Sequence, residues 1–337
     1  MAKSDKAGHK IRILVVKLSS LGDLFHVLPA VHMLKLQLNA TVDWVTQTEY
    51  VPLIQCFPDV DRVIPFPRRR QQGSRVRFLL ELLRHRYDYI CDFQGLMKSA
   101  VLVRLARGAR RIGPSFHREG SRVFYASVAG DRNKNRHAVD ENLDVVRHLG
   151  LEVSTPEFPV KFPRLPLEKP SPRIALVPVT RWKNKCWPEE CFVSAGRQLR
   201  EKTGASLYVL GSDEDVDVCR RVTDDIGGPV VNLAGRTSLV ELGSLLSSMD
   251  LVICNDSGPM HVAAALNVPV VAVFGPTDPT RTGPYGQLER GVLMGRRSCR
   301  PCMDDNCTQG VVVCMREVTP AAVVERGLEI LLHPRMH

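Results

Sequence analysis

The residues best suited to chemistry form one short polar loop, Asn255-Asp256-Ser257-Gly258-Pro259-Met260-His261. An apolar run at 251–254 precedes this loop, and a segment expected to be helical, 261–266, follows it. In α/β folds, anions bind where a parallel strand ends and a helix begins, because free backbone N–H groups and the positive end of the helix dipole meet there. Asp256, Ser257, Gly258 and His261 are therefore candidate binding residues. An ordinary Asp or Ser helix cap is the alternative reading.

Other polar loops follow the neighbouring apolar runs. The basic loop after the run at 174–179 contains Thr180 and Lys185, which are suited to holding phosphate oxygens. The run at 206–210 is followed by two acids, Asp213 and Glu214, which are placed where a ribose hydroxyl could bind. The loop 275–279 follows the run at 270–274. Several such loops on one sheet edge favour a nucleotide site more strongly than any single loop does.

A second candidate site follows the first apolar run of the chain, in Lys17-Leu18-Ser19-Ser20-Leu21-Gly22-Asp23-Leu24. Gly22 would permit a sharp turn, and Asp23 lies at or beside the start of a helix. Asp23 is either a plain helix cap or a carboxylate that takes a proton from a hydroxyl group. Lys17 and His26 are close to it in sequence.

Two common phosphate-binding motifs are absent from the sequence, namely G-x-G-x-x-G and G-x-x-x-x-G-K-[ST]. Rossmann redox cofactors and nucleoside triphosphate hydrolysis are therefore disfavoured. The acids 213–215 could hold a divalent metal, but acids are also common in the first turn of a helix.

The elements that must position these residues alternate between strand and helix. The expected strands are 11–18, 41–45, 62–66, 87–93, 110–113, 174–179, 206–210, 230–233, 251–254 and 270–274. The expected helices are 24–38, 78–85, 96–105, 189–202, 213–226, 238–249, 261–266 and 320–332. This rhythm predicts parallel sheets covered by helices on both faces.

The rhythm breaks where six prolines occur between 151 and 172, which neither a long helix nor a central strand tolerates. We therefore expect an α/β protein of two doubly wound domains facing each other across a cleft. Residues 1–155 would form the first domain, 156–172 a proline-rich linker and 173–337 the second domain.

The positive charge is concentrated in part of the first half. Residues 61–137 carry 18 Lys and Arg against 6 Asp and Glu, a net charge of +12, whereas the whole chain carries +10. A basic domain suggests an acidic partner such as an anionic glycolipid, a membrane surface or a nucleic acid, although aromatic residues are sparse and no nucleic-acid motif is visible. A solvated basic face without a partner is the alternative.

The sequence has no long apolar segment, and its first ten residues are polar. We therefore expect no membrane-spanning helix, no secretory signal and a location in the cytoplasm.

Taken in order, several motifs resemble one family. K-L-S-S-L-G-D-L-F-H-V-L-P-A, D-F-Q-G-L-M-K-S-A, K-x-K-C-W-P-E-E, N-D-S-G-P-M-H-V-A-A-A-L and V-F-G-P-T-D-P together resemble the ADP-heptose:lipopolysaccharide heptosyltransferases of glycosyltransferase family 9. The resemblance runs from about residue 11 to residue 332, and the Q-G-L-M-K-S and W-P-E spacing is closer to the type I enzyme.

This resemblance implies the GT-B architecture and an inverting transfer of heptose from ADP-heptose to the Kdo or inner-core region of lipopolysaccharide, with no metal or other cofactor needed for the chemistry. Asp23 matches the proposed general base, Lys185 and nearby Thr180 match donor contacts, and 256–261 matches the D-[ST]-G-x-x-H donor loop. It also implies a peripheral location at the cytoplasmic face of the inner membrane.

The anionic acceptor would explain the basic first domain, with Lys17, Arg68, Lys98 and Arg136 as candidate acceptor contacts. Family 9 transferases with another acceptor, such as a second core heptose or a protein, remain an alternative. So do a non-catalytic nucleotide-sugar-binding protein and, less favoured by the loop set, a nucleic-acid-binding protein.

Four cysteines near the end, Cys299, Cys302, Cys307 and Cys314, have a spacing compatible with a structural zinc or iron. A related branch, the autotransporter heptosyltransferases, carries a structural iron on cysteines. Free thiols or one redox-labile pair are the alternatives. The other six cysteines are expected to be core or near-surface thiols.

Overall fold

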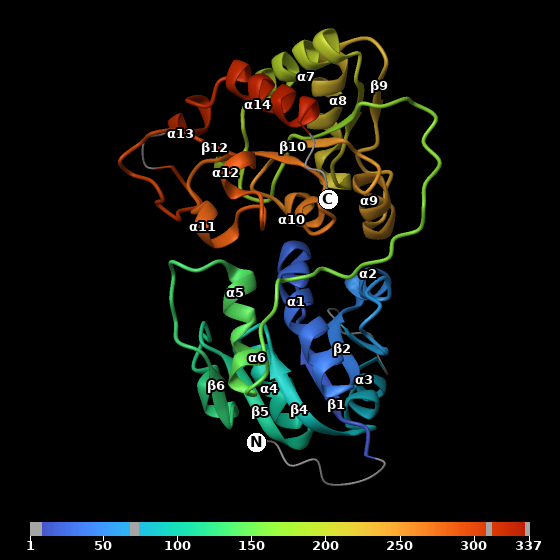
Figure 1. Cartoon of the computed structure of the whole chain (residues 1–337), viewed down its shortest axis with the longest axis vertical. Coiled ribbons are helices and arrows are strands. Elements are labelled where there is room, and N and C mark those ends of the chain that lie inside the picture. The colour runs from blue at the N-terminus through green and yellow to red at the C-terminus, as the bar shows by residue number, and fades with distance from the viewer. Residues whose placement is uncertain (1–8, 68–73, 308–311, 334–337) are drawn as a thin grey trace. The chain divides into compact units, whose positions relative to one another are not determined.

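The computed structural model describes residues 9–67, 74–307 and 312–333, and it divides into two compact units (Figure 1). The first unit takes residues up to 134 and 138–161, and the second takes 135–137 and 162 onward. Between 151 and 172 the backbone forms neither helix nor strand.

The first unit is built on a six-stranded parallel sheet in the order β3-β2-β1-β4-β5-β6. Its strands are β1 (Arg12–Val16), β2 (Thr41–Gln47), β3 (Arg62–Phe66), β4 (Arg86–Asp92), β5 (Arg107–Pro114) and β6 (Ser127–Ala129). The central strand β1 pairs with β2 on one side, Val15 opposite Trp44, and with β4 on the other, Val15 opposite Cys91.

Helices cover this sheet and complete a buried apolar core. They are α1 (Leu21–Leu38), α2 (Val51–Ile54), α3 (Ser74–Leu83), α4 (Met97–Leu105), α5 (Ala138–Asn142) and α6 (Asp144–His148), with the short 3₁₀ turns η1 (Thr48–Tyr50) and η2 (Ser121–Phe124). Phe78 of α3 and Val103 of α4 belong to one core with Ile90 of β4. Helix α4 connects β4 to the neighbouring strand β5, whereas α3 connects β3 to β4 across the width of β2 and β1. The apolar faces of both helices anchor these crossover connections on the sheet.

The second unit repeats this plan with a parallel sheet in the order β12-β11-β10-β7-β8-β9. Its strands are β7 (Arg173–Val177), β8 (Ser206–Val209), β9 (Val230–Asn232), β10 (Leu251–Asn255), β11 (Val270–Phe274) and β12 (Val292–Met294). All five residues of β10 and all five of β11 are buried, as expected of central strands covered on both faces.

The helices of the second unit are α7 (Glu189–Thr203), α8 (Val216–Ile226), α9 (Leu239–Leu246), α10 (Gly258–Ala265), α11 (Pro279–Thr282), α12 (Leu288–Gly291), α13 (Val313–Arg316) and α14 (Pro320–Leu332), with 3₁₀ turns η3 (Lys183–Lys185) and η4 (Asp213–Asp215). Leu199 of α7, Val222 of α8 and Val323 of α14 share one buried core.

Counted from the first strand of each unit, both sheets have the order 3-2-1-4-5-6, the order of Rossmann-like domains. In such sheets the order reverses between the first and fourth strands, and ligands bind at the carboxyl ends of the strands beside that point. The reversal lies between β1 and β4 in the first unit and between β7 and β10 in the second. The predicted α/β class with two doubly wound domains is confirmed.

Helix α3 begins at Ser74 rather than 78, and α8 at Val216 rather than 213. Two further corrections concern helix starts at the candidate sites. Helix α1 begins at Leu21 rather than 24, so Gly22 lies in its first turn and not in a separate sharp turn. Helix α10 begins at Gly258 rather than His261, with Ser257 as its N-cap. Pro259 does not prevent this start, because a proline in the first turn removes no intrahelical hydrogen bond.

Within the described residues, no helix is both long enough and apolar enough to cross a membrane.

Candidate functional site

Asp23 occupies the third helical position of α1, where it forms a capping box with Ser20. The Ser20 backbone N–H and hydroxyl both donate to Oδ2 of Asp23, at 3.0 and 2.7 Å. The other oxygen, Oδ1, lies 4.0 Å from Nδ1 of His26. The helix-cap reading of Asp23 is therefore confirmed. It leaves Oδ1 outside the capping hydrogen bonds, so the same carboxylate retains an oxygen that can accept a proton.

The charge environment keeps Asp23 ionised. Burial alone would raise the pKa of Asp23, but the charges of Lys17 and His26 and the hydrogen bonds from Ser20 outweigh it and hold this pKa well below its ordinary value. The side chain is nevertheless 46% exposed, so solvent reaches the carboxylate. An ionised, accessible carboxylate at the end of the central strand can accept a proton from a bound hydroxyl group.

The loop just before α1 is held by Gln94, which lies just after β4 and was quoted in the sequence analysis only within a motif. Oε1 of Gln94 accepts hydrogen bonds from the backbone N–H groups of Leu18 and Ser19, at 3.1 and 3.2 Å. Gln94 and its neighbour Gly95 are fixed in turn by Oδ1 of the buried Asp92, which accepts from both of their N–H groups. Gln94 is thus a positioning residue that joins the two strand ends at the reversal point.

In the second unit, Asp256 is the residue on which the candidate contacts converge. Its Oδ2 accepts hydrogen bonds from Nζ of Lys185 and from Oγ1 of Thr277, both at 2.7 Å. Its backbone carbonyl accepts a hydrogen bond from Oγ1 of Thr180 at 3.0 Å. These side chains follow β7, β10 and β11, which are neighbours in the sheet. The structure therefore brings together Thr180, Lys185 and Asp256 as predicted, and adds Thr277 from the loop 275–279.

Asn255 holds the β7 loop of this cluster in place. It is fully buried at the end of β10. Its Oδ1 accepts the backbone N–H of Trp187 and its Nδ2 donates to the carbonyl of Pro178, both at 2.8 Å. The β7 loop that carries Lys185 is thus tied at both of its ends to one amide side chain. From the sequence, Asn255 was named only as the first residue of the loop 255–261 and was given no role, because its partners depend on which strands are neighbours.

Ser257 begins helix α10 with a buried side chain. Its hydroxyl has no hydrogen-bond partner among the described residues, and it makes no capping bond to its own helix. Gly258 and His261 lie in the first turn of α10. Backbone N–H groups at a helix start have no intrahelical acceptor, and the helix dipole is positive there. The hydroxyl and these amides together form a set of donors suited to an anion.

Glu214 is not joined to this cluster by the hydrogen bonds described above. It is exposed on η4, after β8. Its role toward a ribose hydroxyl stays a prediction.

The predicted acceptor contacts have mixed surroundings. Lys17 is buried, and its Nζ donates a hydrogen bond to the carbonyl of Phe93 at 2.9 Å. Its ammonium group therefore links the chain just after β1 to the chain just after β4. Lys98 is exposed on α4 with its Nζ 4.5 Å from the ring centre of Phe66. Arg136 is half-buried in the segment grouped with the second unit. Arg68 lies outside the described residues.

The terminal cysteines do not form the ligand set that their spacing suggested. Cys299 and Cys302 are exposed, Cys307 is half-buried and Cys314 is buried. Across the described ranges, no three His, Cys, Asp or Glu side chains gather closely enough to hold a metal ion. Burial lowers the pKa of Arg300, and the nearby Cys314, Cys299 and Cys302 partly oppose that shift. A guanidinium group therefore lies near these thiols, and its positive charge would repel a metal cation. The acids 213–215 likewise form no group that could hold a metal ion in the part of the chain that the structure describes.

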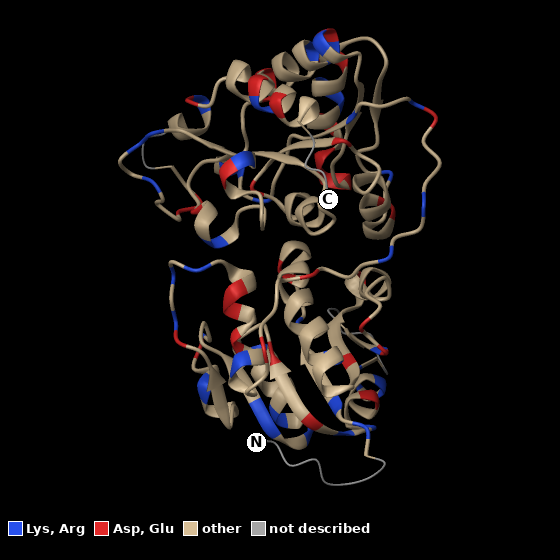
Figure 2. Ribbon diagram, in the orientation of Figure 1, with Lys and Arg blue, Asp and Glu red and all other residues tan. Residues whose placement is uncertain are grey.

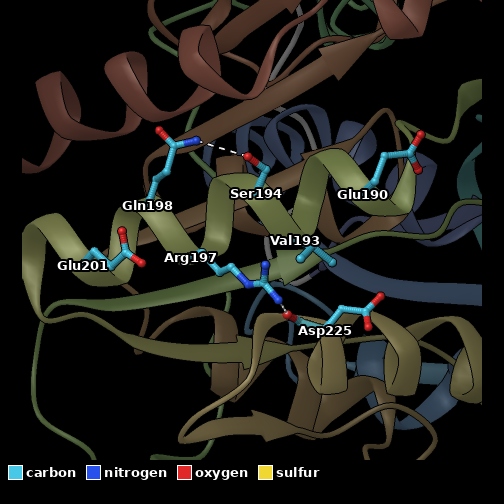
Figure 3. Close-up of a pocket in the computed structure, with 7 residues that line it drawn as sticks. All are labelled: Glu190, Val193, Ser194, Arg197, Gln198, Glu201 and Asp225. Carbon is cyan, nitrogen blue, oxygen red and sulfur yellow. Dashed lines mark hydrogen bonds between the residues drawn. The ribbon is translucent and has the colours of Figure 1, made fainter.

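A shallow hollow of about 450 Å³ lies elsewhere on the second unit (Figure 3). It is lined by α7 and the end of α8, where Gln198 bonds to Ser194 and Arg197 bonds to the carbonyl of Asp225. It contains none of the predicted site residues.

With the two strand-end clusters described, comparison with known proteins decides the family. Residues 75–312 match glycosyltransferase family 9 (heptosyltransferase). The chain belongs to glycosyltransferase family 9. It is therefore a glycosyltransferase.

Individual family 9 relatives match over most of their length. Lipopolysaccharide heptosyltransferase 1 of Pseudomonas aeruginosa is 30% identical, and the match covers 88% of each chain. The structure of the E. coli heptosyltransferase WaaC with ADP superimposes with a TM-score of 0.79 at 26% identity, over 95% of this chain and 99% of that one. WaaC with ADP-2-deoxy-2-fluoro heptose gives a TM-score of 0.76 at 25% identity, over the same shares. The predicted family and GT-B class are confirmed.

Proposed function

We propose that this heptosyltransferase of lipopolysaccharide biosynthesis moves heptose from ADP-heptose to the Kdo or inner-core region, with inversion at the anomeric carbon and Asp23 as the general base. The cluster around Asp256 carries the proposal. An oriented lysine, Lys185, pairs with the residue just before a helix start, where the N-cap hydroxyl of Ser257 is buried with no hydrogen-bond partner among the described residues. Donors of this kind complement a diphosphate.

The chemistry balances within the groups named. Oδ1 of Asp23 takes the proton of an acceptor hydroxyl as that oxygen forms a bond to the anomeric carbon. The bond from the anomeric carbon to the diphosphate oxygen breaks, and its electron pair leaves with ADP. Lys185 and the donors at Ser257 and Gly258 would stabilise the charge that develops on the leaving diphosphate. Because the residues named stabilise that charge, the proposed chemistry needs no metal.

Two observations support the Kdo-proximal, type I assignment and an anionic acceptor. The relative from P. aeruginosa is named heptosyltransferase 1. The region 61–137 of this chain has a net charge of +12, which complements the carboxylates and phosphates of an inner core joined to lipid A. Since such an acceptor is a lipid, we also propose that the enzyme works in the cytoplasm, peripherally at the inner membrane.

The deciding experiment incubates the enzyme with ADP-heptose and Kdo₂-lipid A, then measures ADP release and the mass of the lipid product. We expect one added heptose, and we expect the rate to be unchanged by a metal chelator. Transfer only to an acceptor that already carries a heptose, or to a protein, would replace the type I assignment. ADP binding without turnover on any acceptor would make the chain a nucleotide-sugar-binding protein.

A matched pair of variants tests the donor site within the same assay. Lys185→Ala removes a charged donor, a contact worth about 1.5–3 kcal/mol, so the Kd for ADP should rise about 10- to 150-fold. Lys202→Ala removes an exposed lysine at the far end of α7 and should leave this Kd unchanged. Equal ADP affinity in both variants would contradict the proposed diphosphate contact.

A further inference from the structure

Helix α3 has two apolar faces, only one of which is buried. Phe78 and Leu82 point into the core of the first unit. Four other apolar side chains are exposed, Val76 and Leu80 by 62% and 67%, and Leu79 and Leu83 by 39% and 37%. Their spacing of i, i+3, i+4 and i+7 places them on one helical face. This exposed stripe is not explained by the packing of the unit.

The neighbouring helix extends the stripe. Val101 and Leu105 of α4 are also exposed, by 38% and 47%. The ends of the two helices are joined, because Nη1 of Arg107, just after α4, donates to the carbonyl of Leu83 at 3.5 Å. Near their other ends, Lys98 of α4 lies over the ring of Phe66, and that ring packs edge-on against Phe78 of α3. The exposed apolar side chains of α3 and α4 thus belong to adjacent helices.

Exposed basic side chains border these apolar residues; we call the two sets together the α3–α4 surface. The basic members are Arg75, Arg77, Arg84, Arg86, Lys98, Arg104 and Arg107. The one acid within α3 and α4, Glu81, is already paired with Arg62 at 2.8 Å. Figure 2 shows blue segments along this part of the first unit. A surface that is apolar along its centre and cationic around it matches a bilayer with anionic headgroups.

We propose that the α3–α4 surface docks the enzyme on an anionic lipid bilayer, with Val76, Leu79, Leu80 and Leu83 entering the interface and the arginines meeting the headgroups. The proposal rests on the proposed function, since an acceptor held in a membrane gives the enzyme a reason to bind one. A second copy of the chain fits the surface less well, because pairing two such faces would bring their arginines together.

The test measures flotation of the full chain with vesicles of phosphatidylcholine alone and with vesicles of equal parts phosphatidylcholine and phosphatidylglycerol. We expect binding to the anionic vesicles that weakens as salt is raised. The double variant Arg77→Gln, Arg104→Gln should bind about 25-fold more weakly, at about fivefold for each arginine. The double variant Val76→Ser, Leu80→Ser should lose on the order of tenfold.

Matched substitutions elsewhere serve as controls. Leu36→Ser removes a leucine that is 63% exposed on α1, and Lys202→Gln removes an exposed lysine on α7. Both should bind vesicles as the unchanged enzyme does. All variants should retain turnover on a water-soluble, deacylated acceptor, which shows that they are folded.

Failure of the membrane proposal and failure of the proposed function give different results. No binding of the unchanged enzyme to anionic vesicles, or equal binding by the Val76→Ser, Leu80→Ser variant, overturns the membrane proposal. Sedimentation of a dimer that this variant converts to a monomer overturns it too, because the face would then join two copies. Vesicle binding without turnover on the soluble acceptor overturns the proposed function but supports membrane docking by the α3–α4 surface.

Discussion

Ser20 donates two hydrogen bonds to a single oxygen of Asp23, and this fixes the direction of the other oxygen. The capping box satisfies an N–H at the start of α1 and restricts the rotation of the carboxylate. A base with a restricted side chain loses less entropy on aligning with its substrate than a freely rotating one. The helix cap and the proposed base are therefore two roles of one residue.

Asp23→Ala is expected to lower turnover by about 10²- to 10⁴-fold, the usual contribution of a general base, while the Kd for ADP stays nearly unchanged. Steady-state kinetics and ADP titration measure the two quantities separately. Glu241→Ala is the control, because Glu241 forms an equivalent capping box with Ser238 at the start of α9. It should lower the melting temperature but not the turnover. Weakened ADP binding with normal turnover in Asp23→Ala would show that the role of Asp23 is wrong.

The pH dependence follows from the lowered pKa of Asp23. Because this pKa lies well below its ordinary value of 3.8, the carboxylate stays ionised through about pH 5 to 8, and protonation of Asp23 should not limit kcat/KM there. The stability contributed by ionised Asp23 is fully present above the unfolded pKa and is lost as the pH falls through the folded pKa. The difference in melting temperature between the unchanged enzyme and Asp23→Asn should therefore shrink only in acid. If this difference in melting temperature were already lost near neutral pH, the lowered pKa of Asp23 would be contradicted.

Gln94→Met should slow turnover without weakening ADP binding. It removes the acceptor of the Leu18 and Ser19 N–H groups and so loosens the loop before Asp23. We expect kcat to fall on the order of tenfold, since small displacements of a catalytic group are costly. Gln198→Met, which breaks a hydrogen bond to Ser194 on α7, is the matched control and should leave kcat unchanged. A rise in the Kd for ADP in Gln94→Met would place Gln94 in donor binding instead.

Ser257→Ala should separate binding from stability. Its buried hydroxyl has no partner among the described residues, so its removal should leave the melting temperature of the free enzyme unchanged or slightly higher. ADP binding should weaken about fivefold, and Ser257→Thr should restore it. The buried Ser244 bonds to the carbonyl of Val240, so Ser244→Ala should show the reverse, a lower melting temperature with unchanged ADP affinity. A large loss of stability in Ser257→Ala would mean that the hydroxyl has a structural partner.

Asn255→Ala is expected to destabilise the second unit by about 2–4 kcal/mol. It leaves the N–H of Trp187 and the carbonyl of Pro178 without their buried partner. Denaturant unfolding measures this cost. Asn232→Ala removes one hydrogen bond, to the N–H of Ala234, at a half-buried position and should cost clearly less. Equal costs would mean that Asn255 does not hold the β7 loop.

Much of the fold was predictable from local patterns. The bounds of β3, β11 and α14 agree with the expected ranges, because each is an apolar or amphipathic run with clear ends. The three-residue strands β6 and β12 were missed, whereas the equally short β9 was predicted within 230–233. Helices α1 and α10 start directly after the N-cap residues Ser20 and Ser257, and the apolar pattern does not reveal these starts.

The candidate site was predictable where it followed from single loops. Asp256, Lys185 and Thr180 were identified and lie together. Gln94, Asn255 and Thr277 were named only as parts of motifs or loops. Each acts across neighbouring strands, and strand order is a tertiary property that the sequence pattern does not give. The four cysteines do not form a ligand group among the described residues, since spacing along the chain does not ensure that side chains converge.

The pairing of Lys185 with Asp256 has a consequence for the end of each catalytic cycle. An ammonium held against a carboxylate forms a pair without net charge, so it attracts a spent nucleotide less strongly than an isolated lysine would. If Lys185 binds the donor diphosphate as proposed, the pair would keep a directional contact for the leaving group and would limit inhibition by ADP. Exchange of ADP for fresh donor would then slow repeated turnover less.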